Sequence, residues 1–149
     1  METVLITGAS SGLGYEFAKL FAEKGYDLVI SARREERLNS FKKSYPNISI
    51  EIIPCDLSLD GGAEYLYNKV MEKNITVNIL INNAGFGLFG EFKETDLKKE
   101  EEMINLNIKA LTGLTKLFLK DMLEKDHGKI LNVASIAAFQ PGPYMSIYY

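Results

Sequence analysis

The chain has 149 residues, of which 46% are hydrophobic and 25% charged, with a net charge of -3 and one cysteine. This composition is ordinary for a folded domain, and the length favours a single one. The weak negative charge argues against nucleic acid or an anionic membrane as a partner. One cysteine excludes an internal disulfide and a cysteine metal cluster, so we expect no metal site. No apolar run is long enough for a membrane span or a signal peptide, which predicts a cytoplasmic protein.

A glycine-rich segment follows the first apolar run. Val4–Ile6 is predicted as a buried strand, and the amphipathic run from Tyr15 to Lys24 as a helix. Between them the sequence reads Thr7-Gly8-Ala9-Ser10-Ser11-Gly12-Leu13-Gly14. Strand, glycine turn and helix form the context of a dinucleotide-phosphate loop, in which amides of the first helical turn and the helix dipole face the phosphates.

Each glycine of this segment has its own predicted task. Gly8 adopts the backbone angles of a tight turn, Gly12 lets the main chain approach a pyrophosphate, and Gly14 lets the helix pack against the strand. The spacing G-x-x-x-G-x-G differs from the general G-x-G-x-x-G fingerprint. Taken alone, such a turn also occurs for geometry only.

Apolar runs alternate with helical patterns along the rest of the chain. Strands are predicted over residues 27–32, 48–55, 77–81 and 129–134, and helices over residues 33–45, 59–73 and 95–125. This alternation is typical of βαβ units and a parallel sheet. We therefore expect an α/β fold of the Rossmann type, with a doubly wound parallel sheet in the order 3-2-1-4-5 between two helical layers. The residues predicted to face inward are Leu13, Phe17, Leu20 and Phe21, then Leu38 and Phe41, then Leu59, Ala63, Leu66 and Val70.

The helix predicted over residues 95–125 carries two apolar stripes. The first comprises Ile104, Ile108, Leu111, Thr115, Phe118 and Met122, and the second comprises Leu106, Ala110, Gly113 and Leu117. Two stripes predict burial on two sides, one against the sheet and one against another helix or subunit. We therefore expect a homo-oligomer formed through this helix.

Short motifs recur in a fixed order along the chain. They are the glycine segment from Thr7 to Gly14, Asp56-Leu57, Asn82-Asn83-Ala84-Gly85, Asn107, Ser135 and Tyr148. In combination they resemble the short-chain dehydrogenase/reductase family over the whole chain. The resemblance implies that residues 1–149 are an NAD(P)-binding Rossmann domain. It also implies hydride transfer that interconverts the carbonyl and alcohol forms of a small-molecule substrate.

The resemblance also implies roles for single residues. The cofactor-binding residues would be Gly8, Ser10, Ser11, Gly12, Leu13, Gly14, Arg33, Asp56, Leu57, Asn83, Ala84 and Gly85. Among these, Asp56 would contact the adenine ring and Asn83 would brace its strand beside the cofactor. The catalytic residues would be Asn107, Ser135 and Tyr148. Tyr148 stands thirteen residues after Ser135, the commoner family spacing, and Tyr149 is the alternative.

The family pattern places a lysine four residues after the tyrosine, which falls beyond Tyr149. A tyrosine phenol has a pKa of about 10, and in the family the lysine lowers this pKa toward the working pH. The fold would be incomplete after its fifth strand. The alternative to an enzyme is therefore an inactive NADP-binding or dimerising fragment. A polypeptide that really ended at Tyr149 is expected to associate or aggregate and to show no turnover.

The cofactor preference is predicted from the end of the second strand. Ala32 stands where an NAD enzyme carries a ribose-binding acid, and Arg33 follows it. An arginine there can bind a 2′-phosphate, which favours NADP(H) over NAD(H). The alternative for Arg33 is a solvated charge run, and for Asp56 a simple helix cap. Cys55 ends an apolar run and is predicted to be a small buried core residue.

Overall fold

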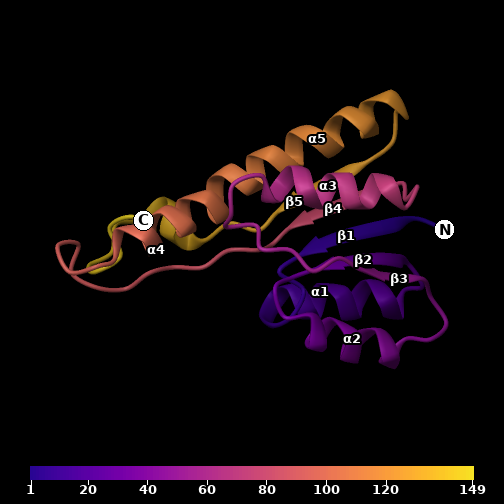
Figure 1. The fold of residues 1–149 in the computed structure, drawn as a ribbon, viewed down its shortest axis with the longest axis horizontal. Coiled ribbons are helices and arrows are strands. Elements are labelled where there is room, and N and C mark those ends of the chain that lie inside the picture. The colour runs from indigo at the N-terminus through magenta and orange to yellow at the C-terminus, as the bar shows by residue number, and fades with distance from the viewer.

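A five-stranded parallel sheet forms the centre of the computed structural model, which describes residues 1–149 (Figure 1). The strands are β1 (Thr3–Thr7), β2 (Asp27–Ser31), β3 (Ile50–Ile52), β4 (Ile79–Asn82) and β5 (Lys129–Asn132). Their order is β3-β2-β1-β4-β5, and every pairing is parallel. The predicted doubly wound order is confirmed. In such a sheet a ligand crevice opens at the carboxyl ends of the strands where the order reverses, here between β1 and β4.

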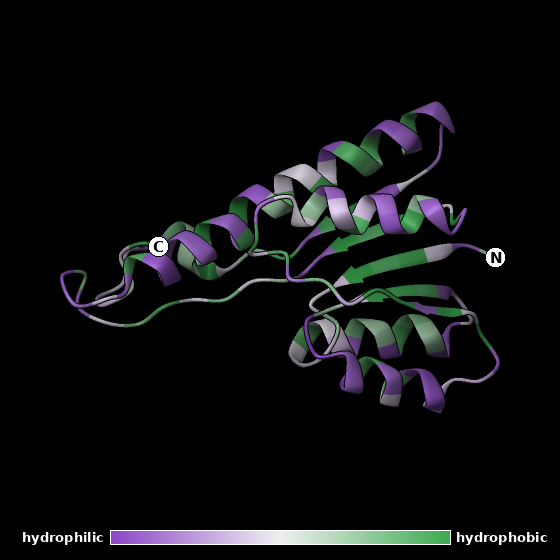
Figure 2. Cartoon of the chain, in the orientation of Figure 1, coloured by the Kyte–Doolittle hydropathy of each residue, from purple (hydrophilic) through white to green (hydrophobic).

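Helices cover both faces of the sheet (Figure 1). Helices α1 (Gly12–Glu23) and α2 (Glu35–Ser44) lie on one face, and α3 (Gly62–Glu72) and α5 (Leu111–Glu124) on the other. Along β1 the side chains alternate between the two cores, because successive residues of a strand point to opposite faces. Val4 and Ile6 join the α1–α2 core, whereas Leu5 joins the α3–α5 core. Figure 2 shows the result as apolar strands between helices whose outer faces are polar.

The buried face of α1 differs from the prediction. Leu13 and Leu20 are 62% and 47% exposed, while Gly14, Ala18 and Ala22 are buried. Small residues face the sheet because α1 lies close against it, and the larger side chains on either side of that strip are displaced outward. Elsewhere the predicted inward residues of α2 are confirmed, as are those of α3 except one. Leu59 is exposed because α3 begins only at Gly62.

The predicted long helix is continuous but not uniform. It consists of α4 (Leu97–Ile104), a π-helical segment (Asn105–Ala110) and α5. Its buried residues are Glu100, Met103, Ala110, Leu114, Phe118 and Met122, a face that follows neither predicted stripe. Ile104 and Ile108 are exposed, so the first stripe is wrong at its beginning. A π turn holds more residues than an α turn, so regular α spacing cannot be extended through it.

The fifth strand lies at the edge of the sheet, as predicted. Leu131 in β5 is 43% exposed, whereas the whole of β4 is buried. The chain after β5 contains one short 3-10 turn (Ile136–Phe139) within the predicted loop. None of the helices combines the length and apolar character needed to cross a bilayer.

Candidate active site

One large cleft opens at the carboxyl ends of the strands. Its volume is about 790 Å³, within the usual range of small-molecule sites. Every residue predicted to bind cofactor or act in catalysis lines it except Gly14. The predicted residues in its wall are Gly8, Ser10, Ser11, Gly12, Leu13, Arg33, Asp56, Leu57, Asn83, Ala84, Gly85, Asn107, Ser135 and Tyr148. Residues from six separate parts of the sequence therefore share one surface.

The three glycines of the β1–α1 loop have distinct geometries. Gly8 and Gly12 have φ values of +68° and +58°, which side chains rarely adopt. A Cβ on Gly12 would meet nothing within 4 Å, so the main chain there borders open space. A Cβ on Gly14 would lie 2.4 Å from the carbonyl oxygen of Gly8. Gly14 thus lies beneath the cleft and permits the close packing of α1 against the loop.

The ends of β1 and β4 are tied together by side chains. The amides of Asn83 and Ala84 each donate to Thr7 Oγ1 at 3.0 Å. The Asn83 side chain donates through Nδ2 to the carbonyl oxygen of Thr7, also at 3.0 Å. Asn83 therefore braces the strand end from which the glycine loop starts, and the loop cannot move independently of β4.

The first turn of α1 has no side-chain cap. Ser11 precedes the helix, and its side chain makes no capping hydrogen bond to it. The first amides of a helix have no partner inside the helix, and the helix dipole makes this end positive. The loop geometry and this uncapped end together fit a phosphate group.

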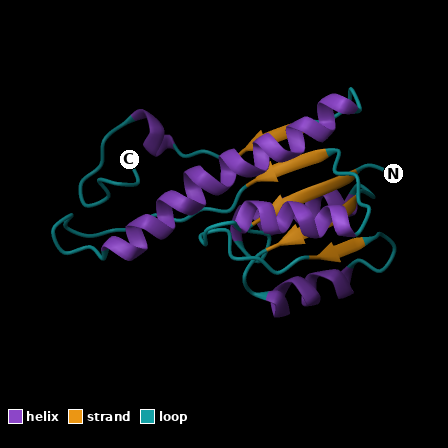
Figure 3. Cartoon of the chain, turned by 45° about the horizontal axis from the view of Figure 1, so that its top comes forward, coloured by secondary structure: helices purple, strands orange, loops and turns teal.

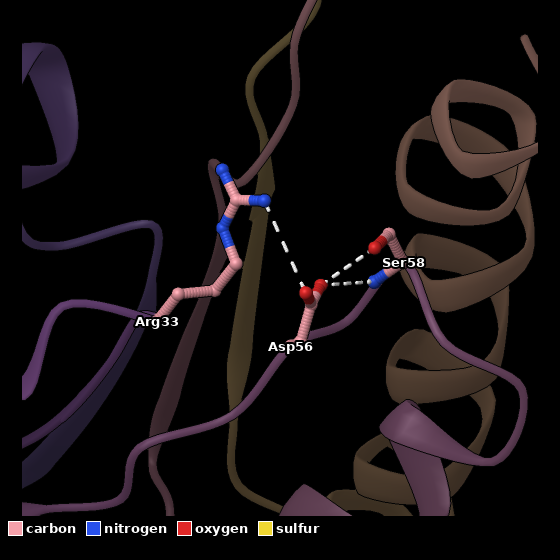
Figure 4. A network of polar contacts seen from close by, with 3 residues as sticks. All are labelled: Arg33, Asp56 and Ser58. Atoms are coloured by element: carbon pink, nitrogen blue, oxygen red, sulfur yellow. Dashed lines mark hydrogen bonds and ion pairs between the residues drawn. The ribbon is translucent and has the colours of Figure 1, made fainter. Parts of the chain in front are cut away.

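Arg33 and Asp56 lie opposite each other at the β2 and β3 side of the cleft (Figure 4). Arg33 Nη1 is 3.9 Å from Asp56 Oδ2. Asp56 Oδ1 accepts hydrogen bonds from the amide of Ser58 at 3.0 Å and from its hydroxyl at 2.6 Å. The residue that caps α3 is Gly61. The alternative interpretation of Asp56 as a helix cap is therefore wrong, since it closes a local turn instead.

Arg34 is a residue of the cleft that the sequence prediction did not include. Its Nη2 donates to Ser10 Oγ at 3.1 Å and to Ser11 Oγ at 2.9 Å. Two adjacent arginines thus diverge, one toward Asp56 and one across the glycine loop. The arginine pair is visible in the sequence, but which way each side chain turns depends on the start of α2 at Glu35.

The cleft also has a buried thiol in its wall. Cys55 is buried, as predicted, and lines the cleft beside Asp56. Burial, reinforced by the neighbouring Asp56 carboxylate, raises the pKa of the Cys55 thiol to about 11. The thiol is neutral at physiological pH and is not a nucleophile there.

Asn107 lies in the π-helical segment, a feature that often occurs at functional sites. Its Nδ2 donates to the carbonyl oxygen of Phe86 at 2.8 Å, and its Oδ1 accepts from the amide of Phe86 at 3.1 Å. This paired contact compensates the poor helix propensity of asparagine. It fixes the loop that follows β4, so Asn107 holds one wall of the cleft.

Ser135 and Tyr148 come to the cleft from the chain after β5. Ser135 Oγ accepts from the amide of Ala137 at 3.1 Å and begins the 3-10 turn. The ring of Tyr148 packs on Gly87, where a Cβ would be 3.4 Å from it. Tyr149 also lines the cleft. The choice of Tyr148 as the reacting tyrosine stays a prediction.

Asn82, buried below the cleft, was not assigned a role from the sequence. Its Nδ2 donates to Thr115 Oγ1 and to Asn132 Oδ1, both at 2.9 Å. It thereby ties β4 to α5 and β5. No cluster of three or more metal-ligating side chains is present.

Comparison with known proteins gives a consistent result. The family model described as short chain dehydrogenase matches residues 2–149. A very-long-chain 3-oxoacyl-CoA reductase of Pyrenophora tritici-repentis is 34% identical over 97% of this chain and 44% of its own length. The uncharacterized oxidoreductase DltE of Bacillus subtilis is 34% identical over 99% of this chain and 58% of its own. The chain therefore spans about half the length of these curated relatives.

Solved structures show the same similarity. A short-chain dehydrogenase from Sphingobium yanoikuyae in complex with NADPH has a TM-score of 0.90 and 35% identity, covering 99% of this chain and 59% of that one. The bulky-bulky ketone specific alcohol dehydrogenase from Comamonas testosteroni has a TM-score of 0.90 and 32% identity, covering 99% and 60%. A serine dehydrogenase complexed with NADP+ has a TM-score of 0.88 and 30% identity, covering 98% and 59%.

Proposed function

This chain belongs to the short chain dehydrogenase family of oxidoreductases, and we propose that the protein interconverts a carbonyl and an alcohol with NADP(H) as hydride donor or acceptor. One observation carries the proposal. A single cleft joins the glycine loop, the two arginines after β2 and the three predicted catalytic residues. The cleft therefore has a phosphate-binding end and a proton-donating end on one continuous surface. This arrangement fits a dinucleotide that lies along the strand ends, with the substrate beyond it.

The phosphate-binding end would be held mainly by main chain. The open space over Gly12 would let the pyrophosphate approach, and the uncapped first turn of α1 would face it. Asp56 would contact the adenine ring with Leu57 beside it. Asn83 would hold this end rigid through its bonds to Thr7.

The preference for NADP(H) would come from the residues after β2. Ala32 provides no carboxylate for a ribose, and Arg33 and Arg34 supply two positive charges within the cleft. The ion pair of Arg33 with Asp56 is 3.9 Å long and its arginine side chain is 70% exposed. Such pairs contribute little, so Arg33 can leave Asp56 for a 2′-phosphate at small cost. The neighbours bound to NADPH and NADP+ support this preference.

At the reaction end, the cofactor supplies or accepts a hydride at the substrate carbon when it is bound. In reduction, Tyr148 would donate a proton to the carbonyl oxygen as that carbon is reduced. Ser135 Oγ would donate a hydrogen bond to the same oxygen, because its contact with Ala137 uses it only as an acceptor. Asn107 would support the proton relay from the loop it fixes, since both ends of its amide contact Phe86.

We also propose association through the long helix. Five large apolar side chains of this helix are exposed: Leu97, Ile104, Ile108, Leu119 and Leu123. A row of exposed apolar residues at helical spacing fits a second copy of the same helix. Light scattering of the natural full-length protein across a concentration series is expected to show a homo-oligomer, and Ile108→Glu is expected to dissociate it. A monomer at every concentration would exclude this association.

The proposed reaction is tested on the natural full-length protein. NADPH oxidation is followed with a panel of ketones and aldehydes, and NADP+ reduction with the matching alcohols. Tyr148→Phe is expected to lower turnover by about 10²-fold or more, the contribution of general acid catalysis, and to leave NADPH binding intact. Tyr149→Phe is the matched control. Equal losses in both variants would contradict the assignment, and NADPH binding without any turnover would favour a non-catalytic NADP-binding module.

A further inference from the structure

A second, very small crevice lies where the loop after β4 meets the C-terminal segment. Gly90 and Thr95 of the loop, Glu100 of α4, and Tyr144 and Ser146 of the C-terminal segment contribute to its walls. Its space of about 10 Å³ admits at most one water molecule. It is therefore a contact between three segments and not a ligand site.

Glu100 is the only charged residue of the chain that is buried, with 6% of its surface exposed. A buried carboxylate is costly unless donors or a helix dipole stabilise it. Here Thr95 Oγ1 donates to Glu100 Oε1, and the residue lies in the first turn of α4, after the cap Asp96. Its neighbour Glu101 is exposed on the same helix. The chain thus holds one particular carboxylate inside this contact while leaving the adjacent one in solvent.

The C-terminal segment is attached to the loop at this contact. The amide of Gly90 donates to the carbonyl oxygen of Tyr144 at 2.8 Å, and the rings of Phe89 and Tyr144 lie 5.5 Å apart. Tyr144 adopts a φ of +61°, which is strained for a side chain of this size. Figure 3 shows this segment beside the loop and the start of α4, away from the body of the sheet.

Tyr148 is carried by the turn that follows this attachment. The amide of Tyr149 donates to the carbonyl oxygen of Met145 at 3.0 Å, which closes the turn. The ring of Tyr148 then packs on Gly87 of the same loop. Any shift of the loop against the segment moves the phenol in the cleft.

We propose that Glu100 is a positioning residue for Tyr148. Its buried carboxylate fixes the junction between residues 86–95 and residues 144–149, and the junction sets where the phenol lies. The proposal rests on the proposed function, in which Tyr148 donates the proton. A misplacement of about 1 Å at a reacting group can cost about 10²-fold in rate, so a residue outside the cleft can control turnover in this way.

The activity test compares variants of the natural full-length protein. Glu100→Ala and Thr95→Val are expected to lower kcat by about 10- to 100-fold. The Kd for NADPH should stay within about twofold, because neither Glu100 nor Thr95 lines the cleft. Glu100→Gln is expected to restore most of the kcat, since its amide oxygen still accepts from Thr95. Glu101→Ala is the matched control and should behave as the wild type. An equal kcat loss in Glu101→Ala, or a parallel loss of NADPH affinity in Glu100→Ala, would overturn the proposal.

A second measurement does not depend on turnover. Amide hydrogen exchange read by mass spectrometry is expected to show faster exchange over residues 86–90 and 144–149 in Glu100→Ala than in the wild type or Glu101→Ala. Unchanged exchange in these peptides would refute the proposed role of Glu100 in fixing the junction. If the wild type had no reductase activity but the exchange difference were present, the proposed function would fail while the role of Glu100 in the junction would stand.

Discussion

The two ends of the cleft are built differently. At the phosphate-binding end, the loop between β1 and α1 starts from a fully buried part of the sheet and is fastened to β4 through Thr7 and Asn83. At the reaction end, Ser135 and Tyr148 follow β5, an edge strand whose residues are largely exposed. The C-terminal segment reaches the cleft by crossing to the loop after β4 (Figure 3).

Because of this difference, we expect changes at the two ends to affect folding stability and turnover to different degrees. The phosphate-binding end includes buried residues such as Thr7 and Gly14, so a change at one of those positions alters folding and cofactor binding together. The reaction end is held by a few side-chain contacts, those of Asn107 with Phe86 and of Glu100 with Thr95. Changes there are expected to alter turnover more than stability. The predictions that follow test this separation.

The largest effect is expected from Gly14→Ala. The added Cβ would lie 2.4 Å from the carbonyl oxygen of Gly8 and from Nδ2 of Asn83, and main chain cannot yield as a flexible side chain can. Overpacking of this kind costs up to about 3 kcal/mol, and the shift of the loop should also abolish NADPH binding. Urea unfolding and cofactor titration measure the two effects. Gly25→Ala, where a Cβ meets open space but φ is +80°, should lose about 1–2 kcal/mol to backbone strain and leave binding intact. A Gly14→Ala protein with wild-type stability would contradict the link between the phosphate-binding end and the stability of the core.

Gly12→Val should separate the two properties within the same loop. Gly12 borders open space but has a φ of +58°, so a side chain costs about 1–2 kcal/mol in backbone strain without a clash. The valine would occupy the place where the pyrophosphate must approach, and NADPH binding should be lost. Circular dichroism measures whether the fold is retained, and cofactor titration of the same sample measures NADPH binding. Retained binding would show that the phosphate site lies elsewhere.

The sequence predicts the phosphate-binding end better than the reaction end, and the reason is locality. The β1–α1 segment determines its own turn, glycine geometry and helix start within a few residues, and strand order follows from the βαβ alternation. The buried face of the long helix was missed because a π turn interrupts its period between Asn105 and Ala110. The spacing of apolar residues does not predict a π-helical turn.

Side-chain directions account for the other differences. Arg34 could not be distinguished from Arg33 as the residue that reaches Ser10 and Ser11, because that contact joins positions more than twenty residues apart. Glu100 stands in a run of three glutamates that resembles a solvated face. Only the tertiary structure shows that one of the three is buried.

A smaller effect is expected from the two arginines. Arg33→Ala should weaken NADPH binding by roughly 1.5–3 kcal/mol, the scale of a charge-assisted hydrogen bond, and leave NADH binding nearly unchanged. Arg34→Ala should weaken the binding of NADH and NADPH alike, because its contacts to two serines order the loop for either cofactor. Calorimetric titration of both cofactors at low salt measures the differences. Equal affinity of the wild type for NADH and NADPH would contradict the predicted preference.

The smallest effect concerns pH and Cys55. Burial, with Asp56 beside it, raises the pKa of this thiol from 9.0 to about 11 in the folded protein. The folded state therefore retains the proton where the unfolded state has released it. Above pH 9.0 the unfolded state gains by ionisation, so stability falls with rising pH until about 11 and changes no further from this group.

Cys55→Ala removes this dependence. Other groups titrate in both proteins and cancel in the difference, so the stability of the wild type relative to the variant should be constant below pH 9.0 and decline above it. Urea unfolding at closely spaced pH values gives the curve. Because Cys55 lines the phosphate-binding end, NADPH should also slow its alkylation. A difference in stability that stays flat through alkaline pH would mean that the thiol is open to solvent. That end of the cleft would then be less rigidly closed than its contacts with the core imply.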